Sequence, residues 1–193
     1  WNIWGSLAGL LFGQGINVLL NMFFGPVVNA ARGISIQVNQ AIDQFARNFQ
    51  IAVDPQITKS FANNELQEMH QLIFRASKFT FFMLFLLSLP VLMETEAILN
   101  FWLVEPPQYT ALFIRITLTI VVIDSVARPL MTSAAATGKV KKYQSVIGGI
   151  LLTIVPIAYV VLKQGGSPSS VFVVHLIICV IAFIRSEERR VGK

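Results

Sequence analysis

Charged and amide side chains recur through the segment from Gly25 to Gln56, which lies between two strongly apolar runs. If this segment is a helix with about 100° per residue, six of its polar side chains fall in one sector roughly 80° wide. These six are Arg32, Asn39, Asp43, Arg47, Gln50 and Asp54. Arginine stays charged, and its planar guanidinium matches phosphate oxygens. The face is therefore suited to binding an anionic, phosphate-bearing group.

A simpler interpretation is that Asp43 and Arg47, at positions i and i+4, pair with each other and only fix helix packing. That pair leaves the rest of the face without a role. The other polar residues on or beside it are Arg32, Gln40, Gln44, Gln50 and Asp54. Because a charge at the centre of a bilayer costs about 2.5 to 3.5 kcal/mol, this face cannot turn toward lipid. A cavity lined by the face accounts for the whole set better.

A second charged pair, Asp124 and Arg128, has the same i, i+4 spacing further along the chain. Arg128 joins the candidate cavity residues. Arg115 lies on the opposite side of the same expected helix, so we interpret it as a structural partner. The carboxylates Asp43, Asp54 and Asp124 are candidates for coupling to H⁺ or Na⁺, although pairing with arginine is the simpler role for each.

Signals for catalysis or metal binding are weak. His175 and Cys179 share one face of the last apolar segment, but a metal site would need further ligands. No Ser-His-Asp order and no phosphate-binding glycine loop stands out. The single cysteine excludes an internal disulfide. We therefore predict a protein that is not an enzyme, without catalytic residues, metal or cofactor.

Composition indicates a membrane protein. The chain has 193 residues, of which 54% are hydrophobic and 13% charged, and its mean hydropathy is +0.65. A soluble domain usually carries about 25% charged residues. The net charge is +5, but the basic residues are scattered among apolar segments. Membrane lipids are therefore expected partners and nucleic acid is not.

The apolar pattern predicts an all-α, polytopic transmembrane bundle with about six spans, each needing about 20 residues. The expected spans are about 3–24, 31–57, 79–92, 109–136, 143–162 and 170–184. An amphipathic stretch at about 64–79 is expected to lie in the membrane interface. The glycines of the first span predict close helix contacts, and prolines predict kinks. They are Gly5, Gly9, Gly13 and Gly15, and Pro90, Pro129 and Pro156.

Lysine and arginine concentrate in alternate connections. They occur in 59–78, in the loop "GKVKKY" and after Ile184, whereas the loop with Glu94, Glu96 and Glu105 has none. By the positive-inside rule, six spans place both ends of this chain in the cytoplasm.

Six stretches carry a resemblance to a known family. They are "GQGINVLLNMFFGPVVNAARGISIQVN", "NFQIAVDPQITKSFA", "HQLIFRASKF", "LSLPVLMETEAILNFWL", "PLMTSAAATGKVKKYQ" and "IGGILLTIVPIAYVVLK". In this order they resemble the C-terminal part of Bacteroidetes-type polysaccharide (O-antigen) flippases. These are Wzx-like proteins of the multidrug/oligosaccharidyl-lipid/polysaccharide exporter superfamily. The resemblance covers about residues 1–184 and is specific at the level of the family.

The resemblance implies one lobe of a two-lobe, MATE-like transporter in the bacterial cytoplasmic (inner) membrane. Such a transporter moves polyprenyl-diphosphate-linked oligosaccharide across the membrane for surface polysaccharide biosynthesis. Its partners would be that lipid-linked oligosaccharide and a missing N-terminal bundle. In the family, cavity arginines are thought to hold the diphosphate, and Arg32 and Arg47 match by position, with Arg128 less directly. The start at Trp1 indicates a fragment, and we interpret the polar tail at 185–193 as a truncation or artefact.

Three other functions stay open. A cation-coupled multidrug or metabolite antiporter of the same superfamily would need an acid-dominated cavity, whereas arginine slightly outnumbers aspartate here. A membrane enzyme acting on lipid phosphate would need a nucleophile or metal cluster. A structural scaffold would leave the charged face without a use.

Overall fold

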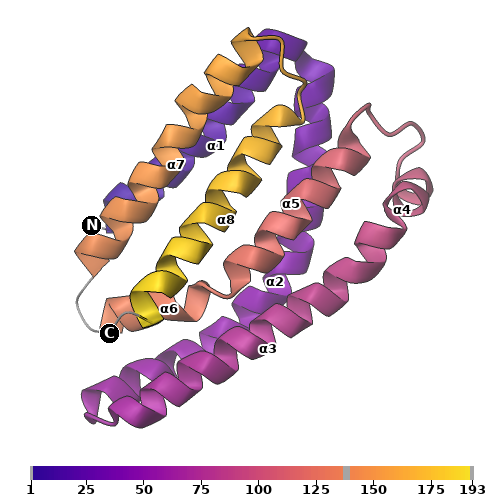
Figure 1. Cartoon of the computed structure of the whole chain (residues 1–193). Helices are drawn as coiled ribbons and strands as arrows, with labels where there is room; N and C mark the ends of the chain where they lie inside the picture. The colour runs from indigo at the N-terminus through magenta and orange to yellow at the C-terminus, as the bar shows by residue number, and fades with distance from the viewer. Residues whose placement is uncertain (1, 137–139, 192–193) are drawn as a thin grey trace.

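The computed structural model describes residues 2–136 and 140–191, and throughout these ranges the chain forms helices joined by short connections (Figure 1). The eight helices are α1 (Asn2–Phe24), α2 (Pro26–Ala62), α3 (Leu66–Met93), α4 (Thr95–Trp102), α5 (Thr110–Ser125), α6 (Arg128–Ala136), α7 (Val140–Lys163) and α8 (Ser170–Val191). The predicted all-α class is confirmed. The loop "GKVKKY" lies partly outside the described residues, and the side chains of the tail lie wholly outside them.

Helices α1 and α2 are joined by one residue, Gly25, whose φ of 80° is a conformation that residues with a Cβ rarely adopt. Pro26 then opens α2, where its missing N–H has no helical partner to lose. Helix α2 runs for 37 residues, which is about 55 Å. Since a bilayer core is about 30 Å thick, α2 is longer than the predicted span at 31–57 and longer than a membrane requires.

The segment expected to lie separately in the membrane interface, 64–79, is instead continuous with the predicted third span. Both belong to α3, whose first turns pack against the last turns of α2. Met69 and Ile73 of α3 are buried with Ile57 of α2. Most of the apolar side of the amphipathic stretch is therefore covered by protein, although Leu66 at its start is exposed. Together these ends of α2 and α3 form a hairpin that projects at the lower left of Figure 1.

The expected span at 109–136 is divided. Helix α5 ends at Ser125, a turn occupies Val126 and Ala127, and α6 begins at Arg128. Pro129 explains the interruption, because proline has no N–H and disfavours helical backbone in the residue before it. The acidic connection before α5, expected as a loop, contains the short helix α4.

Helix α5 lies at the centre of the bundle. Phe113 is buried in a cluster with residues of α1, α7 and α8, including Leu20 and Ile154. On the other side of α5, Leu118 is buried with Leu84 of α3 and residues of α2. Figure 1 shows the resulting order, with α1 and α7 at one edge, α8 and α5 in the middle and α3 at the far edge.

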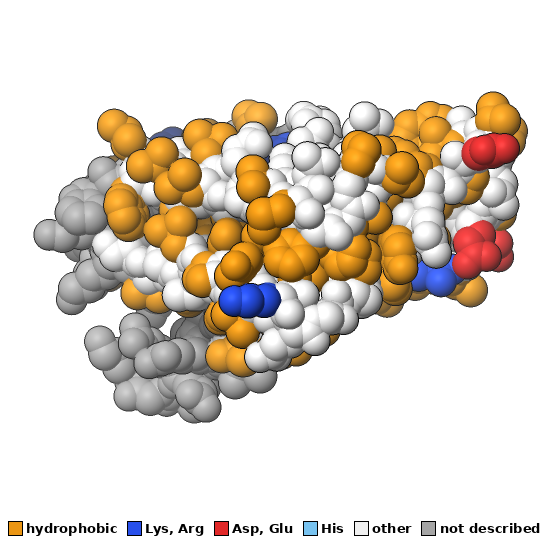
Figure 2. All heavy atoms as spheres, turned by 90° about the horizontal axis from the view of Figure 1, so that it is seen from above, with side chains coloured by type: hydrophobic (Ala, Val, Ile, Leu, Met, Phe, Trp, Pro, Cys, Tyr) orange, Lys and Arg blue, Asp and Glu red, His pale blue; other side chains and the backbone are white. Residues whose placement is uncertain are grey.

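Three described helical segments are long and apolar enough to cross a membrane: Ile3–Phe24, Leu66–Met93 and Ser145–Lys163. The apolar part of α8, Ser170–Ile181, is shorter. Large hydrophobic side chains are exposed along the bundle, and Figure 2 shows them spread over one face. The chain is therefore an all-helical protein compatible with a membrane, and the count of six spans stays a prediction.

The two ends of the bundle differ in charge. The turn between α2 and α3, with basic residues nearby, lies toward the end where α1 begins and α8 finishes (Figure 1). Acidic side chains gather at the other end, where α4 lies (Figure 2). The orientation of the bundle in a membrane stays a prediction.

Glycines on both helices allow α1 and α7 to pack closely: Gly148 of α7 faces Trp4 and Ala8, and Gly15 of α1 faces Val155. A Cβ added at Gly15 would lie 3.0 Å from both Cγ atoms of Val155, whereas Gly9 and Gly13 have nothing within 4 Å. We expect Gly15→Leu to lower the free energy of unfolding by about 1 to 2 kcal/mol, because the added side chain overpacks this contact. Thermal unfolding in detergent would measure the loss. Gly9→Leu is the matched control, and equal losses for the two variants would contradict the prediction.

Candidate functional site

The polar sector of α2 predicted from the sequence lies on the border between the buried and exposed sides of the helix. Arg32 is buried, with 7% of its surface exposed. Asn39, Asp43, Gln50 and Asp54 are half-buried, and only Arg47 is exposed. The six side chains therefore do not line one open surface of this bundle, and the cavity they were expected to line stays a prediction. These side chains have different surroundings, which decide what each can do.

Arg32 is held by α1. Its Nη1 donates a hydrogen bond to Oδ1 of Asn17, and its Nη2 donates to the carbonyl oxygen of Gly13 at 3.1 Å. Both acceptors are neutral. Among the residues that the structure describes, no carboxylate lies within 4.0 Å of this guanidinium. Arg32 is thus a buried cation with hydrogen-bond partners but without a paired negative charge.

Asp43 is shared by two arginines from different helices. Its Oδ2 lies 3.4 Å from Nη1 of Arg47, one turn later in α2, and its Oδ1 forms an ion pair with Nη2 of Arg128 in α6. The Asp43–Arg47 contact that was considered as the simpler interpretation is present. Arg128 pairs with Asp43 of α2, and Asp124 is also close enough to interact electrostatically with Arg128 and with Asp43. Two carboxylates therefore balance the two guanidiniums of this cluster.

A second contact joins α6 to α2. The hydroxyl of Thr132 donates to Oδ1 of Asp54 at 2.9 Å. Asp54 therefore has a neutral partner. Near the end of α5, Asp124 lies close to the thiol of Cys179 in α8. Of the three carboxylates considered for ion coupling, Asp43 is the one that forms ion pairs with two arginines.

Two amides of the predicted sector have unused hydrogen-bonding atoms. Oδ1 of Asn39 and Nε2 of Gln50 are buried, and neither has a hydrogen-bond partner among the described residues. Buried polar atoms without partners are uncommon in folded proteins, because each has lost its water. Each of these two atoms therefore carries a desolvation cost in this bundle that no hydrogen bond offsets.

The exposed side of α2 carries a row of amides that the sequence analysis did not place at the centre of the site. With Arg32 at zero, this row and Arg47 span about 60° to 160° around the helix. Its members are Gln37, Gln40, Gln44 and Asn48, and all are exposed. Arg47 donates to Gln44 at 3.2 Å, and Gln44 donates to Asn48 at 2.9 Å. The same helical angles would have identified this row from the sequence. The predicted face was instead centred on the charged residues near the angle of Arg32.

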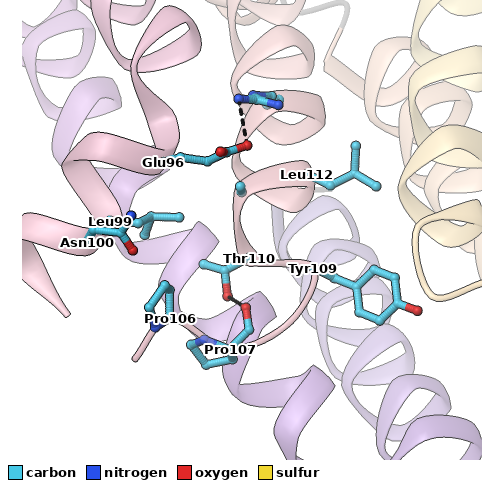
Figure 3. A pocket seen from close by; sticks show the side chains of 10 residues that line it. Glu96, Leu99, Asn100, Pro106, Pro107, Tyr109, Thr110 and Leu112 are labelled. Atoms are coloured by element: carbon cyan, nitrogen blue, oxygen red, sulfur yellow. Dashed lines mark hydrogen bonds and ion pairs between the residues drawn. The ribbon is translucent and has the colours of Figure 1, made fainter. Parts of the chain in front are cut away.

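A hollow of about 390 Å³ lies elsewhere, between α4 and the start of α5 (Figure 3). Its lining includes Glu96, Asn100, Tyr109 and Arg115, and none of the predicted cavity residues. Arg115 Nη2 lies 3.4 Å from a carboxylate oxygen of Glu96. The interpretation of Arg115 as a structural partner agrees with this pair.

The two residues considered for a metal site have other contacts. The His175 ring packs edge to face against Phe12, with the ring centroids 4.9 Å apart. Cys179 contacts Asp124, as described above. Over the described part of the chain, no group of three or more His, Cys, Asp or Glu side chains could hold a metal ion.

Comparisons with known proteins give no assignment. No protein-family model, no curated protein and no solved structure matches the chain.

Proposed function

We propose that this chain is one lobe of a membrane transporter, and that α2 faces the pathway of an anionic, lipid-linked substrate. The observation that supports this most is the exposed row of Gln37, Gln40, Gln44 and Asn48 with Arg47, on a bundle whose exposed surface is otherwise rich in apolar side chains. A polar row of this kind needs water or protein as its neighbour.

The row is too long for all of its side chains to reach the polar surface of a membrane. From Gln37 to Asn48 the helix rises about 17 Å, which is more than half of a hydrocarbon core about 30 Å thick. An arginine or a series of amides turned toward acyl chains over this length would be costly. A water-filled passage between this bundle and a second one would hydrate the row and leave the apolar surfaces in lipid.

The chemistry of the row fits a phosphate-bearing glycolipid. Amides both donate and accept hydrogen bonds, as sugar hydroxyls require. Arg47 is exposed beside these amides, and its planar guanidinium suits a diphosphate. We therefore assign the chain to transport of polyprenyl-diphosphate-linked oligosaccharide for surface polysaccharide biosynthesis, as a flippase. The exposed guanidinium of Arg47 disfavours the cationic substrates of a multidrug antiporter.

Coupling and orientation follow from the same arrangement. Asp43 contacts two arginines and Asp124 lies near Arg128, so Asp54, whose partner is a hydroxyl, is the carboxylate left to exchange H⁺ or Na⁺. The basic end of the bundle belongs in the cytoplasm of a bacterial cell, and the acidic end with α4 faces outward. The second bundle of the transporter completes the passage.

A test of the proposal uses a bacterial host that lacks its own polysaccharide flippase. The host expresses the chain within its full-length reading frame, and surface polysaccharide is measured. We expect Arg47→Ala to reduce transport about tenfold or more, because a charge-assisted phosphate contact contributes about 1.5 to 3 kcal/mol. Arg32→Ala combined with Arg47→Ala should abolish transport, while membrane insertion is retained.

Lys59→Ala is the matched control, because Lys59 is an exposed basic residue near the end of the same helix. It should leave transport unchanged. Normal surface polysaccharide in the double alanine variant would rule out the proposed role of α2. Loss of polysaccharide in the Lys59 variant alone would place the important charge outside the passage.

A further inference from the structure

Helix α4 separates apolar from polar side chains, yet its apolar side is not covered by the bundle. Thr95 and Leu99 face inward and are buried. Phe101 is 95% exposed, Trp102 is 50% exposed and Ile98 is 39% exposed. On a helical projection, Glu96 and Asn100 lie opposite Ile98.

The position of α4 limits what can cover this side. The candidate span in α3 ends at Met93, and α4 begins at Thr95, so only Glu94 separates the two helices. A helix that starts one residue after a span ends must lie close to the membrane surface. It also lies at the acidic end of the bundle, opposite the chain termini (Figures 1 and 2).

The composition of α4 and its continuation fits the boundary between headgroups and acyl chains. Tryptophan prefers this depth, since its ring is apolar and its N–H needs a polar partner. Beyond α4, Val104 is fully exposed, which extends the apolar surface along the chain. On the opposite side, Glu96 lines the hollow of Figure 3 together with Asn100 and Arg115. Polar groups on one side and bulky apolar groups on the other are typical of a helix lying in the interface.

We propose that α4 is a membrane-surface helix whose partner is the lipid bilayer itself. It lies in the plane of the interface, inserts Ile98, Phe101 and Trp102 among the upper acyl chains, and holds Glu96 and Asn100 in the aqueous headgroup layer. This role belongs to α4 and not to the stretch at 64–79, whose apolar side packs on α2. The inference does not depend on transport.

Fluorescence of Trp102 tests the proposal directly. The chain with Trp1→Phe and Trp4→Phe keeps Trp102 as its single tryptophan and is reconstituted in phosphatidylcholine–phosphatidylglycerol vesicles. Bromine atoms on the acyl chains are placed either near the headgroup or near the methyl end. We expect a blue-shifted emission and stronger quenching by the shallow bromine than by the deep one, with weak quenching by aqueous iodide.

A pair of neighbouring substitutions supplies the control. Phe101→Asp puts a charge on the apolar side of α4 and should shift the emission toward that of indole in water, with loss of bromolipid quenching. Asn100→Asp adds the same charge to the polar side and should leave both unchanged. Equal effects from the two variants would overturn the proposal.

Two other results would also overturn it. Strong iodide quenching without bromolipid quenching would place Trp102 in water. Protection from both quenchers would show that protein, such as a second bundle or another copy, covers α4. If the single-tryptophan protein does not fold, a nitroxide spin label can be attached at Phe101→Cys in a Cys179→Ala background. Its accessibility to oxygen and to a water-soluble nickel complex is then measured. The proposal expects oxygen to reach the label more readily than the nickel complex does.

Discussion

Asp43→Ala is expected to lower the free energy of unfolding of this bundle by about 3 kcal/mol, because one carboxylate neutralises two guanidiniums. Without Asp43, Arg47 regains water easily, since its side chain is 46% exposed. Arg128 does not, because its side chain is only 25% exposed and it belongs to the short helix α6. Its ion pair and the contact of Thr132 with Asp54 both join α6 to α2. Thermal or denaturant unfolding of purified protein in detergent would measure the loss.

Asp54→Ala is the matched control on the same helix. It removes a hydrogen bond to a neutral hydroxyl, so its expected loss is about 1 kcal/mol. In a second control, Asp43→Leu is combined with Arg128→Leu, which removes the ion pair without leaving a charge at α6 unpaired. Apolar replacement of an ion pair is often neutral or stabilising, so this variant should recover most of the stability. The prediction fails if Asp43→Ala is no more destabilising than Asp54→Ala.

Helix formation and the membrane character of the chain follow closely from local sequence. Long apolar runs, the first of them ended by Gly25 and Pro26, predict helices 3–24 and 143–162 within a few residues of α1 and α7. Predicted helix boundaries are less accurate where an amphipathic stretch is followed directly by an apolar one. The amphipathic stretch and the apolar stretch that follows it form the single helix α3, because no residue between them interrupts the backbone hydrogen bonds.

The orientation of α2 could be predicted only in part. Angular spacing identifies which side chains share a side of the helix, and it correctly brings Asp43 and Arg47 together. It does not say which side is buried, because that depends on residues distant in sequence. Gly13 and Asn17 in α1 turn Arg32 inward, and α6 covers Asp54. These partners exist only after the helices have packed.

The short helix α4 is missed by sequence reasoning for a related reason. Its eight residues are fewer than the length at which hydrophobic periodicity is reliable, and its glutamates suggest a solvated loop. The separation of its sides becomes clear only when Leu99 is seen to be buried and Phe101 exposed.

Replacing Arg32 by leucine is expected to abolish transport without lowering the free energy of unfolding. The buried guanidinium has neutral partners only, so the folded bundle carries the cost of desolvating its charge without an opposing carboxylate. Replacing it by an apolar side chain, together with Asn17→Leu to remove the unpaired amide, should leave the free energy of unfolding within about 1 kcal/mol of the original or raise it. The same variant should lose transport of a phosphate-bearing lipid, measured as surface polysaccharide in the flippase-deficient host.

The comparison with lysine shows which property of Arg32 is used. The substitution Arg32→Lys keeps the charge but removes the planar fork that reaches Asn17 and the Gly13 carbonyl together. If the residue serves to bind an anion, lysine should retain part of the transport that leucine loses. If instead Arg32→Leu with Asn17→Leu unfolds the bundle, Arg32 is a structural link between α1 and α2. Phosphate binding would then fall to Arg47, the exposed arginine beside the row of amides on α2.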